Sequence, residues 1–115
     1  PGPLIICHCT DCQRQSGSAF GEVMVVDEGD FALTRGEVRG FGMTAASGRP
    51  KTGHFCPDCG TRIYHVNTIR PGKVSLRAGT LDDTAGLSPV RHIWTRSKQP
   101  WVVIPEGVET AEAQG

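Results

Sequence analysis

The chain has 115 residues, and its 12 Lys and Arg residues balance 12 Asp and Glu residues, so the formal net charge is zero. A neutral chain lacks the clustered cations needed to wrap a phosphate backbone. Its apolar runs, such as residues 23–26, are far shorter than the roughly 20 residues of a membrane-spanning helix. The length favours one domain, and the 15 Gly and 8 Pro residues argue against a helical bundle.

Short strands separated by turns are predicted along most of the chain. Residues 1–6 form an opening segment that ends in an apolar run, and residues 13–18 (QRQSGS) allow at most one helical turn because Gly17 interrupts them. The predicted strands cover residues 19–26, 31–34, 37–43, 74–78, 92–95 and 101–104, while residues 52–55 and 61–66 lead into and out of a cysteine cluster. This pattern indicates a mainly β fold with few or no helices.

The two ends of the sequence carry little structural signal. The sequence shows no basic segment followed by an apolar stretch, the pattern of a secretory leader. Because the chain begins at Pro1, an earlier leader that has been removed is still compatible with the sequence. The sequence from Pro105 onward is polar and lacks apolar spacing. We therefore expect a single zinc-binding β domain over residues 1–108, followed by a loose polar tail over residues 109–115.

All five cysteines fall in two tight clusters. Without a sign of export, we expect a reducing, cytoplasmic setting, in which clustered cysteines are more often metal ligands than disulfides. A structural metal is also a common way to stabilise a small, Gly-rich domain.

The first cluster, Cys7-His8-Cys9-Thr10-Asp11-Cys12, is a C-x-C-x-x-C motif. This spacing can put three sulfurs around one ion from a single loop. Three protein ligands with an open fourth position are the catalytic pattern of zinc, whereas four protein ligands are the structural pattern. Zinc would deprotonate the thiols and leave room for water or a substrate sulfur. In the alternative, two of these cysteines belong to a structural site and the third takes no part.

The second cluster, Phe55-Cys56-Pro57-Asp58-Cys59-Gly60, has the C-P-x-C-G pattern of a zinc knuckle. Pro57 fixes the turn after the first ligand, and Gly60 permits a left-handed conformation after the second. A redox-active C-x-x-C pair is the competing interpretation, but no thioredoxin-like βαβ pattern surrounds it. The knuckle supplies two ligands, so a closed site needs two more.

The spacing leaves two arrangements of the cysteines open. In one, Cys9 and Cys12 join Cys56 and Cys59 in a single closed site and leave Cys7 free. In the other, the first three cysteines hold their own metal, and the knuckle pair lacks partners within this chain.

The segments CHCTDCQRQSGSAF, HFCPDCGTRIYH and HIWTRSKQPWVVIPEGV resemble the glutathione-dependent formaldehyde-activating enzymes, a family also called S-(hydroxymethyl)glutathione synthase that includes centromere protein V. The resemblance covers about residues 3–108. It implies an all-β, tent-like fold shared with a Rab-exchange factor, with a catalytic zinc on Cys7, Cys9 and Cys12. It also implies half of a structural zinc site on Cys56 and Cys59.

Members of that family carry an earlier C-x-C on an N-terminal strand, which completes their structural zinc site. No C-x-C precedes Cys7 in this sequence. We therefore expect the N-terminal strand to be missing here and the structural site on Cys56 and Cys59 to be incomplete.

The function implied by the resemblance is that of a zinc-dependent carbon–sulfur lyase. The thiol of glutathione would take the open zinc position and add to formaldehyde to give S-(hydroxymethyl)glutathione. The catalytic residues would then be Cys7, Cys9 and Cys12, and the partner a small thiol such as glutathione, with no nucleic acid or membrane and with self-association left open. The alternative is a non-catalytic binding module stabilised by one closed four-cysteine zinc site.

Several neighbouring residues have two interpretations each. His8 lies between two cysteines. Its side chain either binds the metal or donates a hydrogen bond to a metal ligand, or it points away from the metal. Arg14 either meets a glutathione carboxylate or is a solvated surface arginine. His54 either supports the knuckle metal or is a plain strand residue. His92, Trp94 and Trp101 either line a pocket or belong to the core. For Ser16 and Ser18, hydrogen bonds to the backbone are favoured over contact with a substrate.

Overall fold

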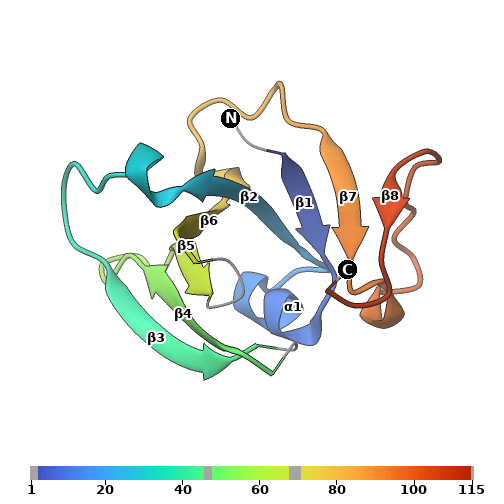
Figure 1. Cartoon of the computed structure of the whole chain (residues 1–115), viewed down its shortest axis with the longest axis horizontal. Coiled ribbons are helices and arrows are strands. Elements are labelled where there is room, and N and C mark those ends of the chain that lie inside the picture. Colours follow the sequence, from blue (N-terminus) through green and yellow to red (C-terminus); the bar gives the residue numbers. More distant parts are fainter. Residues whose placement is uncertain (1–2, 46–47, 68–70, 115) are drawn as a thin grey trace.

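A computed structural model describes residues 3–45, 48–67 and 71–114 of the chain. Its strands are β1 (Leu4–Cys7), β2 (Gly21–Asp27), β3 (Arg39–Thr44), β4 (Pro50–Phe55), β5 (Arg62–Asn67), β6 (Lys73–Arg77), β7 (Pro89–Ile93) and β8 (Glu109–Thr110). They form one 8-stranded sheet in the order β3-β4-β5-β6-β2-β1-β7-β8. Figure 1 shows the sheet curving around the helix α1 (Thr10–Ser16), with β3 and β4 on one side of it and β1 and β7 on the other. The mainly β prediction is confirmed.

Strand β1 is the buried centre of the fold. It pairs antiparallel with β2 and parallel with β7, and all four of its residues are buried. Because side chains alternate between the faces of a strand, Ile5 and Cys7 share one apolar cluster while Leu4 joins another with Met24. The side chain of Cys7 therefore lies on the same face of the sheet as that of Ile5.

Helix α1 is longer than the single turn expected from residues 13–18, so that prediction is wrong. The Sγ of Cys9 accepts a hydrogen bond from the backbone N–H of Cys12 and so caps the first turn. The helix ends at Gly17, whose left-handed φ of 62° lets its N–H reach the carbonyl of Gln13. The start of α1 was not recognised in the sequence because a thiol caps it in place of the usual hydroxyl or carboxylate. No helix in the described part of the chain has the length and apolar character to cross a bilayer.

Two predicted strands are absent from the described structure. Residues 31–34 follow a short 3₁₀ turn, and Phe31 packs against the ring of Tyr64 at a centroid distance of 4.7 Å. Residues 101–104 are irregular, and Val103 is 85% exposed. The apolar character of these residues indicated strands, but neither segment pairs with a strand of the sheet.

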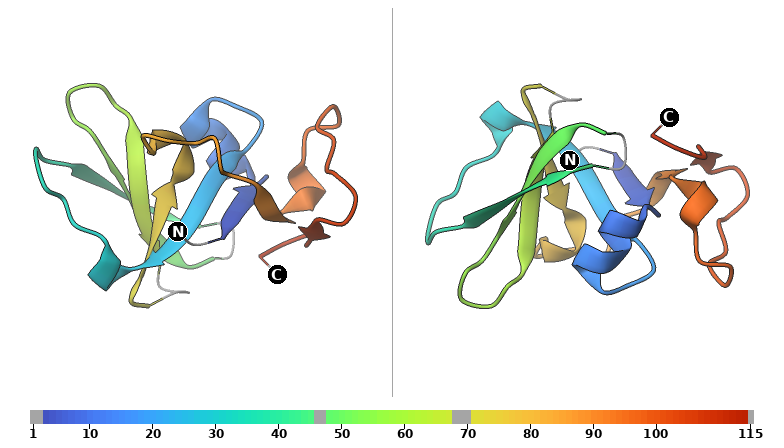
Figure 2. Two further views of the ribbon diagram at one scale, coloured as in Figure 1. Left: turned by 90° about the horizontal axis from the view of Figure 1, so that it is seen from above. Right: turned by 90° about the horizontal axis from the view of Figure 1, so that it is seen from below.

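The residues after position 108 do not form a loose tail. Glu109 and Thr110 form β8, which pairs parallel with β7 (Figure 2). The N–H of Ala111 then donates to the carbonyl of His92 at 2.9 Å, and the carbonyl of Ala111 accepts from the N–H of Thr95 at 3.1 Å. Backbone hydrogen bonds of this kind need no apolar spacing, which is why the polar composition of the segment concealed its order.

The substitution Ala111→Asp tests this C-terminal packing. Ala111 packs against the apolar cluster that contains the first three cysteines, so an unpaired carboxylate there would be desolvated. We expect the free energy of unfolding to fall by about 1–3 kcal/mol, measured by urea denaturation. Glu112→Ala, at an exposed neighbouring position, should change it by less than about 0.5 kcal/mol. Equal, small effects of both substitutions would contradict the observed packing.

Candidate metal centre

The three cysteines of the first cluster meet at the junction of β1 and α1. Cys7 ends β1, Cys9 caps the helix, and Cys12 lies in the first helical turn. Their Sγ atoms all lie within 4.8 Å of one another, and all three residues are buried. Sulfurs on a tetrahedral zinc, with bonds of about 2.3 Å, lie about 3.8 Å apart. The set therefore fits around one ion with small adjustments.

All five cysteines are described, and they form two separate groups. Cys7, Cys9 and Cys12 are the single group of three or more close metal-ligating side chains found in residues 3–45, 48–67 and 71–114. The knuckle pair follows β4 and does not join them. The arrangement with one closed site on Cys9, Cys12, Cys56 and Cys59 is therefore contradicted by the structure.

The knuckle itself has the turn expected from its sequence. The N–H of Cys56 donates to the carbonyl of Thr61 at 2.9 Å, and the N–H of Gly60 donates to the carbonyl of Cys56 at 2.8 Å. Gly60 has a φ of 79°, the left-handed conformation for which glycine was expected. Cys59 is exposed, and hydrogen bonds from Thr61 lower the pKa of its thiol. This pair offers one exposed sulfur, on Cys59, and one partly buried sulfur, on Cys56.

The pKa values of the buried thiols Cys7 and Cys12 are shifted in opposite directions. Hydrogen bonds from Cys7 and Cys9 hold the pKa of Cys12 well below its usual range, and the charges of Arg77 and Lys51 act in the same direction. The pKa of Cys7 is raised in turn, mainly by its hydrogen bonds with the other two thiols and by burial. In the metal-free protein, the nearby cations Arg77 and Lys51 therefore favour a negative charge on the thiol cluster.

A small cavity of about 40 Å³ adjoins the three sulfurs. Its wall includes Lys51 from β4, His65 and Asn67 from β5, and Trp94 just after β7. The space is sufficient for a water-sized ligand beside an ion. No sequence motif singled out Lys51, His65 or Asn67. The signal that could have identified Lys51 is the alternation of side chains along a strand, because Lys51 and Gly53 both lie on the buried face of β4.

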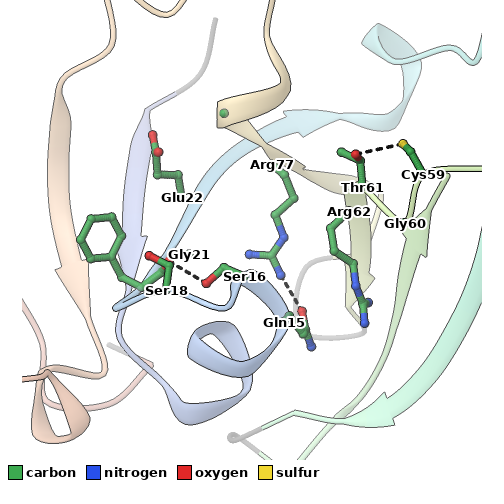
Figure 3. Close-up of a pocket in the computed structure, with 12 residues that line it drawn as sticks. Gln15, Ser16, Ser18, Gly21, Glu22, Cys59, Gly60, Thr61, Arg62 and Arg77 are labelled. Atoms are coloured by element: carbon green, nitrogen blue, oxygen red, sulfur yellow. Dashed lines mark hydrogen bonds between the residues drawn. The ribbon is translucent and has the colours of Figure 1, made fainter.

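A larger pocket of about 440 Å³ lies on the other side of Cys12 (Figure 3). Within it, Nη2 of Arg77 donates to Oε1 of Gln15 at 2.8 Å, and Nη1 of Arg77 contacts the Sγ of Cys12 at 3.9 Å. Gly21 lines this pocket, and a Cβ at this position would lie 2.6 Å from Nη1 of Arg77 and 3.4 Å from the Sγ of Cys12. Glycine here brings the sulfur next to the pocket.

Arg62 gives the same pocket a second guanidinium group. Its side chain lies over the rings of Phe41 and Phe55, at 6.0 and 5.7 Å from their centroids. Its Nη1 is buried and has no hydrogen-bond partner among the described residues. Ser16 and Ser18 also line the pocket, and the hydroxyl of Ser16 donates to the carbonyls of Cys12 and Phe20. The pocket is therefore suited to a polar ligand with anionic groups.

His8 points away from the sulfurs. Its side chain is fully buried, and its Nε2 lies 2.8 Å from Nδ1 of His92, with the two rings stacked. The carbonyl of His8 accepts hydrogen bonds from Nε2 of Gln13 at 2.9 Å and from the hydroxyl of Ser97 at 3.0 Å. His8 thus anchors the cysteine loop from behind. Gln13 and Ser97 were not identified from the sequence because their partner is a backbone atom.

The remaining residues singled out in the sequence are dispersed. Arg14 is exposed and, with Trp101, borders a separate depression away from the sulfurs. Trp101 is 70% exposed, so the core interpretation is wrong for it, whereas Trp94 packs against the cysteine cluster. The ring of His54 stacks on Tyr64 at a centroid distance of 4.4 Å.

Alkylation should separate the two cysteine groups. In metal-free protein at neutral pH, we expect iodoacetamide to modify Cys59 first, because it is exposed and its lowered pKa increases the thiolate fraction. The buried cysteines should react at least about tenfold more slowly, as followed by mass spectrometry. In denaturant, all five should react at similar rates. Early modification of Cys7, Cys9 or Cys12 in folded protein would contradict their burial.

The buried histidine predicts a pH-dependent stability. Burial lowers the pKa of His8 to about 4, and His92 and Lys98 act in the same direction. As the pH falls, the unfolded chain, with an ordinary histidine pKa near 6.5, takes up the proton first. The stabilisation is therefore complete above about pH 6.5 and is lost as the pH falls towards 4, a change of about 3 kcal/mol at most. Urea unfolding of metal-free protein should show this loss, and it should be smaller in His8→Gln.

A search of curated proteins found no match. The family described as glutathione-dependent formaldehyde-activating enzyme matches residues 1–97, which is most of the chain. The three-cysteine motif and the C-x-x-C knuckle both lie inside the matched region. This protein belongs to the glutathione-dependent formaldehyde-activating enzyme family.

Proposed function

We propose that this protein is a carbon–sulfur lyase that forms or cleaves S-(hydroxymethyl)glutathione at a zinc ion held by Cys7, Cys9 and Cys12. The observation that carries the proposal is the meeting of three buried sulfurs, all within 4.8 Å of one another, beside a small cavity. Membership of the family supplies the two reactants, glutathione and formaldehyde.

The donor set suits the proposed ion. Three thiolates are soft ligands that favour zinc, and three protein ligands leave a fourth position for a reactant. When bound, zinc would lower the pKa of a glutathione thiol and hold it as the nucleophilic thiolate. We also propose that Cys56 and Cys59 contribute two ligands to a second, structural zinc site.

The residues around the sulfurs restrict the reaction space. Ile5, Ile93 and Trp94 pack around the cysteines, while polar side chains from β4 and β5 line the rest of the small cavity. Formaldehyde is small enough for the cavity of about 40 Å³. In the addition, the glutathione sulfur bonds to the carbonyl carbon, the π electrons pass to the oxygen, and that oxygen takes up a proton. Cleavage is the reverse, and neither direction needs an oxidant or a reductant.

The larger pocket provides a place for the body of glutathione. Its volume of about 440 Å³ lies within the usual range for small-molecule sites. Arg62 and Arg77 offer two guanidinium groups to the two carboxylates of glutathione, and Gly21, which has no side chain, lies between this pocket and the sulfur of Cys12. This assignment replaces the expected contact with Arg14.

Two further expectations follow from the proposal. A cluster of free, buried thiols functions in a reducing compartment, so we propose a cytoplasmic location. The alternative of a non-catalytic module depended on one closed four-cysteine site, and the separation of the two cysteine groups removes the observation that would favour it.

The proposal is tested by Cys7→Ser in zinc-loaded protein. We expect wild-type protein to accelerate adduct formation from glutathione and formaldehyde above the spontaneous rate, as measured by NMR exchange. Cys7→Ser should lose at least about 100-fold of this acceleration and bind zinc more weakly, because one sulfur ligand is gone. Glu106→Gln, at an exposed turn, is the control. A zinc-loaded wild-type protein that leaves the spontaneous rate unchanged would refute the proposed activity.

A further inference from the structure

Lys51 is a buried cation that forms no ion pair with a carboxylate in the described part of the chain. Its side chain is 8% exposed and lines the cavity beside the three sulfurs. Among the described residues, the ion pairs join Lys73 to Asp27 and Arg91 to Glu109, and no Asp or Glu lines this cavity. A buried ammonium group is rarely retained unless an anion balances it. The available anion is the sulfur cluster.

Arg77 reaches the same sulfurs from another strand. It comes from β6, whereas Lys51 comes from β4, and its Nη1 contacts the Sγ of Cys12 at 3.9 Å. The hydrogen bond from its Nη2 to Gln15 fixes the guanidinium plane in that place (Figure 3). The two cations therefore flank the cluster from two different cavities.

The count of charges favours one kind of fourth ligand. Three thiolates around a divalent ion leave one net negative charge, and a fourth thiolate makes it two. Lys51 and Arg77 supply two positive charges. An added thiolate is therefore balanced, whereas a neutral ligand such as water or imidazole leaves one positive charge without a counterpart in a poorly hydrated site.

We propose that Lys51 and Arg77 are specificity-determining residues, whose charges make the open position of the three-cysteine centre select a thiolate over a neutral ligand. This inference rests on the proposed function, because it assumes a divalent ion on Cys7, Cys9 and Cys12. It adds to that function the physical basis on which the site distinguishes thiols from other small ligands.

The test uses cobalt-substituted protein and two probes, 2-mercaptoethanol and imidazole. 2-Mercaptoethanol has no carboxylate, so its binding does not involve a carboxylate contact with Arg77. Thiolate binding is followed by the sulfur-to-cobalt absorption band, and imidazole binding by the visible cobalt bands. We expect Lys51→Met and Arg77→Gln each to weaken 2-mercaptoethanol binding about tenfold and to leave imidazole binding within about twofold.

Matched variants separate charge from packing. Lys51→Arg and Arg77→Lys keep the charge and should retain 2-mercaptoethanol affinity within about threefold. Lys73→Met removes an exposed cation at the opposite end of β6 from Arg77, outside both cavities, and should leave both affinities unchanged. Circular dichroism confirms that each variant is folded, and chelator competition measures its cobalt affinity as a readout independent of activity.

The outcomes separate this inference from the proposed function. The inference would be overturned if Lys51→Met and Arg77→Gln both kept the wild-type affinity for 2-mercaptoethanol, or if they lost thiol and imidazole binding equally. Neither result would affect the proposed activity, which the assay of wild-type protein tests separately. A wild-type cobalt protein that binds no thiol at all would instead refute the proposed function, and the inference with it.

Discussion

The structure depends on the junction where β1 ends and α1 begins. There the N–H of His8 donates to the carbonyl of Ile93 at 3.0 Å, while Gln13 and Ser97 donate to the carbonyl of His8. These bonds fix the chain direction at a point where a strand becomes a helix. Alternation puts Cys7 on one face and His8 on the other, and the helical turn brings Cys12 back beside Cys9. Three sulfurs meet because of this one local geometry.

Charge balance is the second constraint on the site. The sulfurs are buried, and the cations nearest to them, Lys51 and Arg77, come from strands on the far side of β2 in the sheet. Ile5, Ile93 and Trp94 pack against the sulfurs, and His65 and Asn67 line the adjoining cavity, so the two cations act on a buried cluster. The arrangement stabilises negative charge on sulfur, and a thiolate-based reaction needs the same condition.

The two cysteine groups have different environments and therefore different chemistry. The first is buried beside a cavity, flanked by cations and backed by the stacked pair His8 and His92. The second lies on a surface turn stabilised by backbone hydrogen bonds, with Cys59 exposed. A reacting thiolate gains from the low dielectric of the first environment, whereas a surface turn of the second kind suits a structural ligand pair. Their separation divides the five cysteines into three and two.

The sequence by itself determined the features that depend on neighbours a few residues apart: the mainly β character, the three-sulfur loop and the left-handed turn at Gly60. It missed the length of α1, because a thiol cap is an uncommon signal, and the order of residues 109–114, because backbone pairing leaves no side-chain pattern. Only the tertiary structure decided which cysteines share a site and which cations flank them. Those contacts join strands far apart in the chain, and sheet order and register, which local spacing does not encode, set their positions.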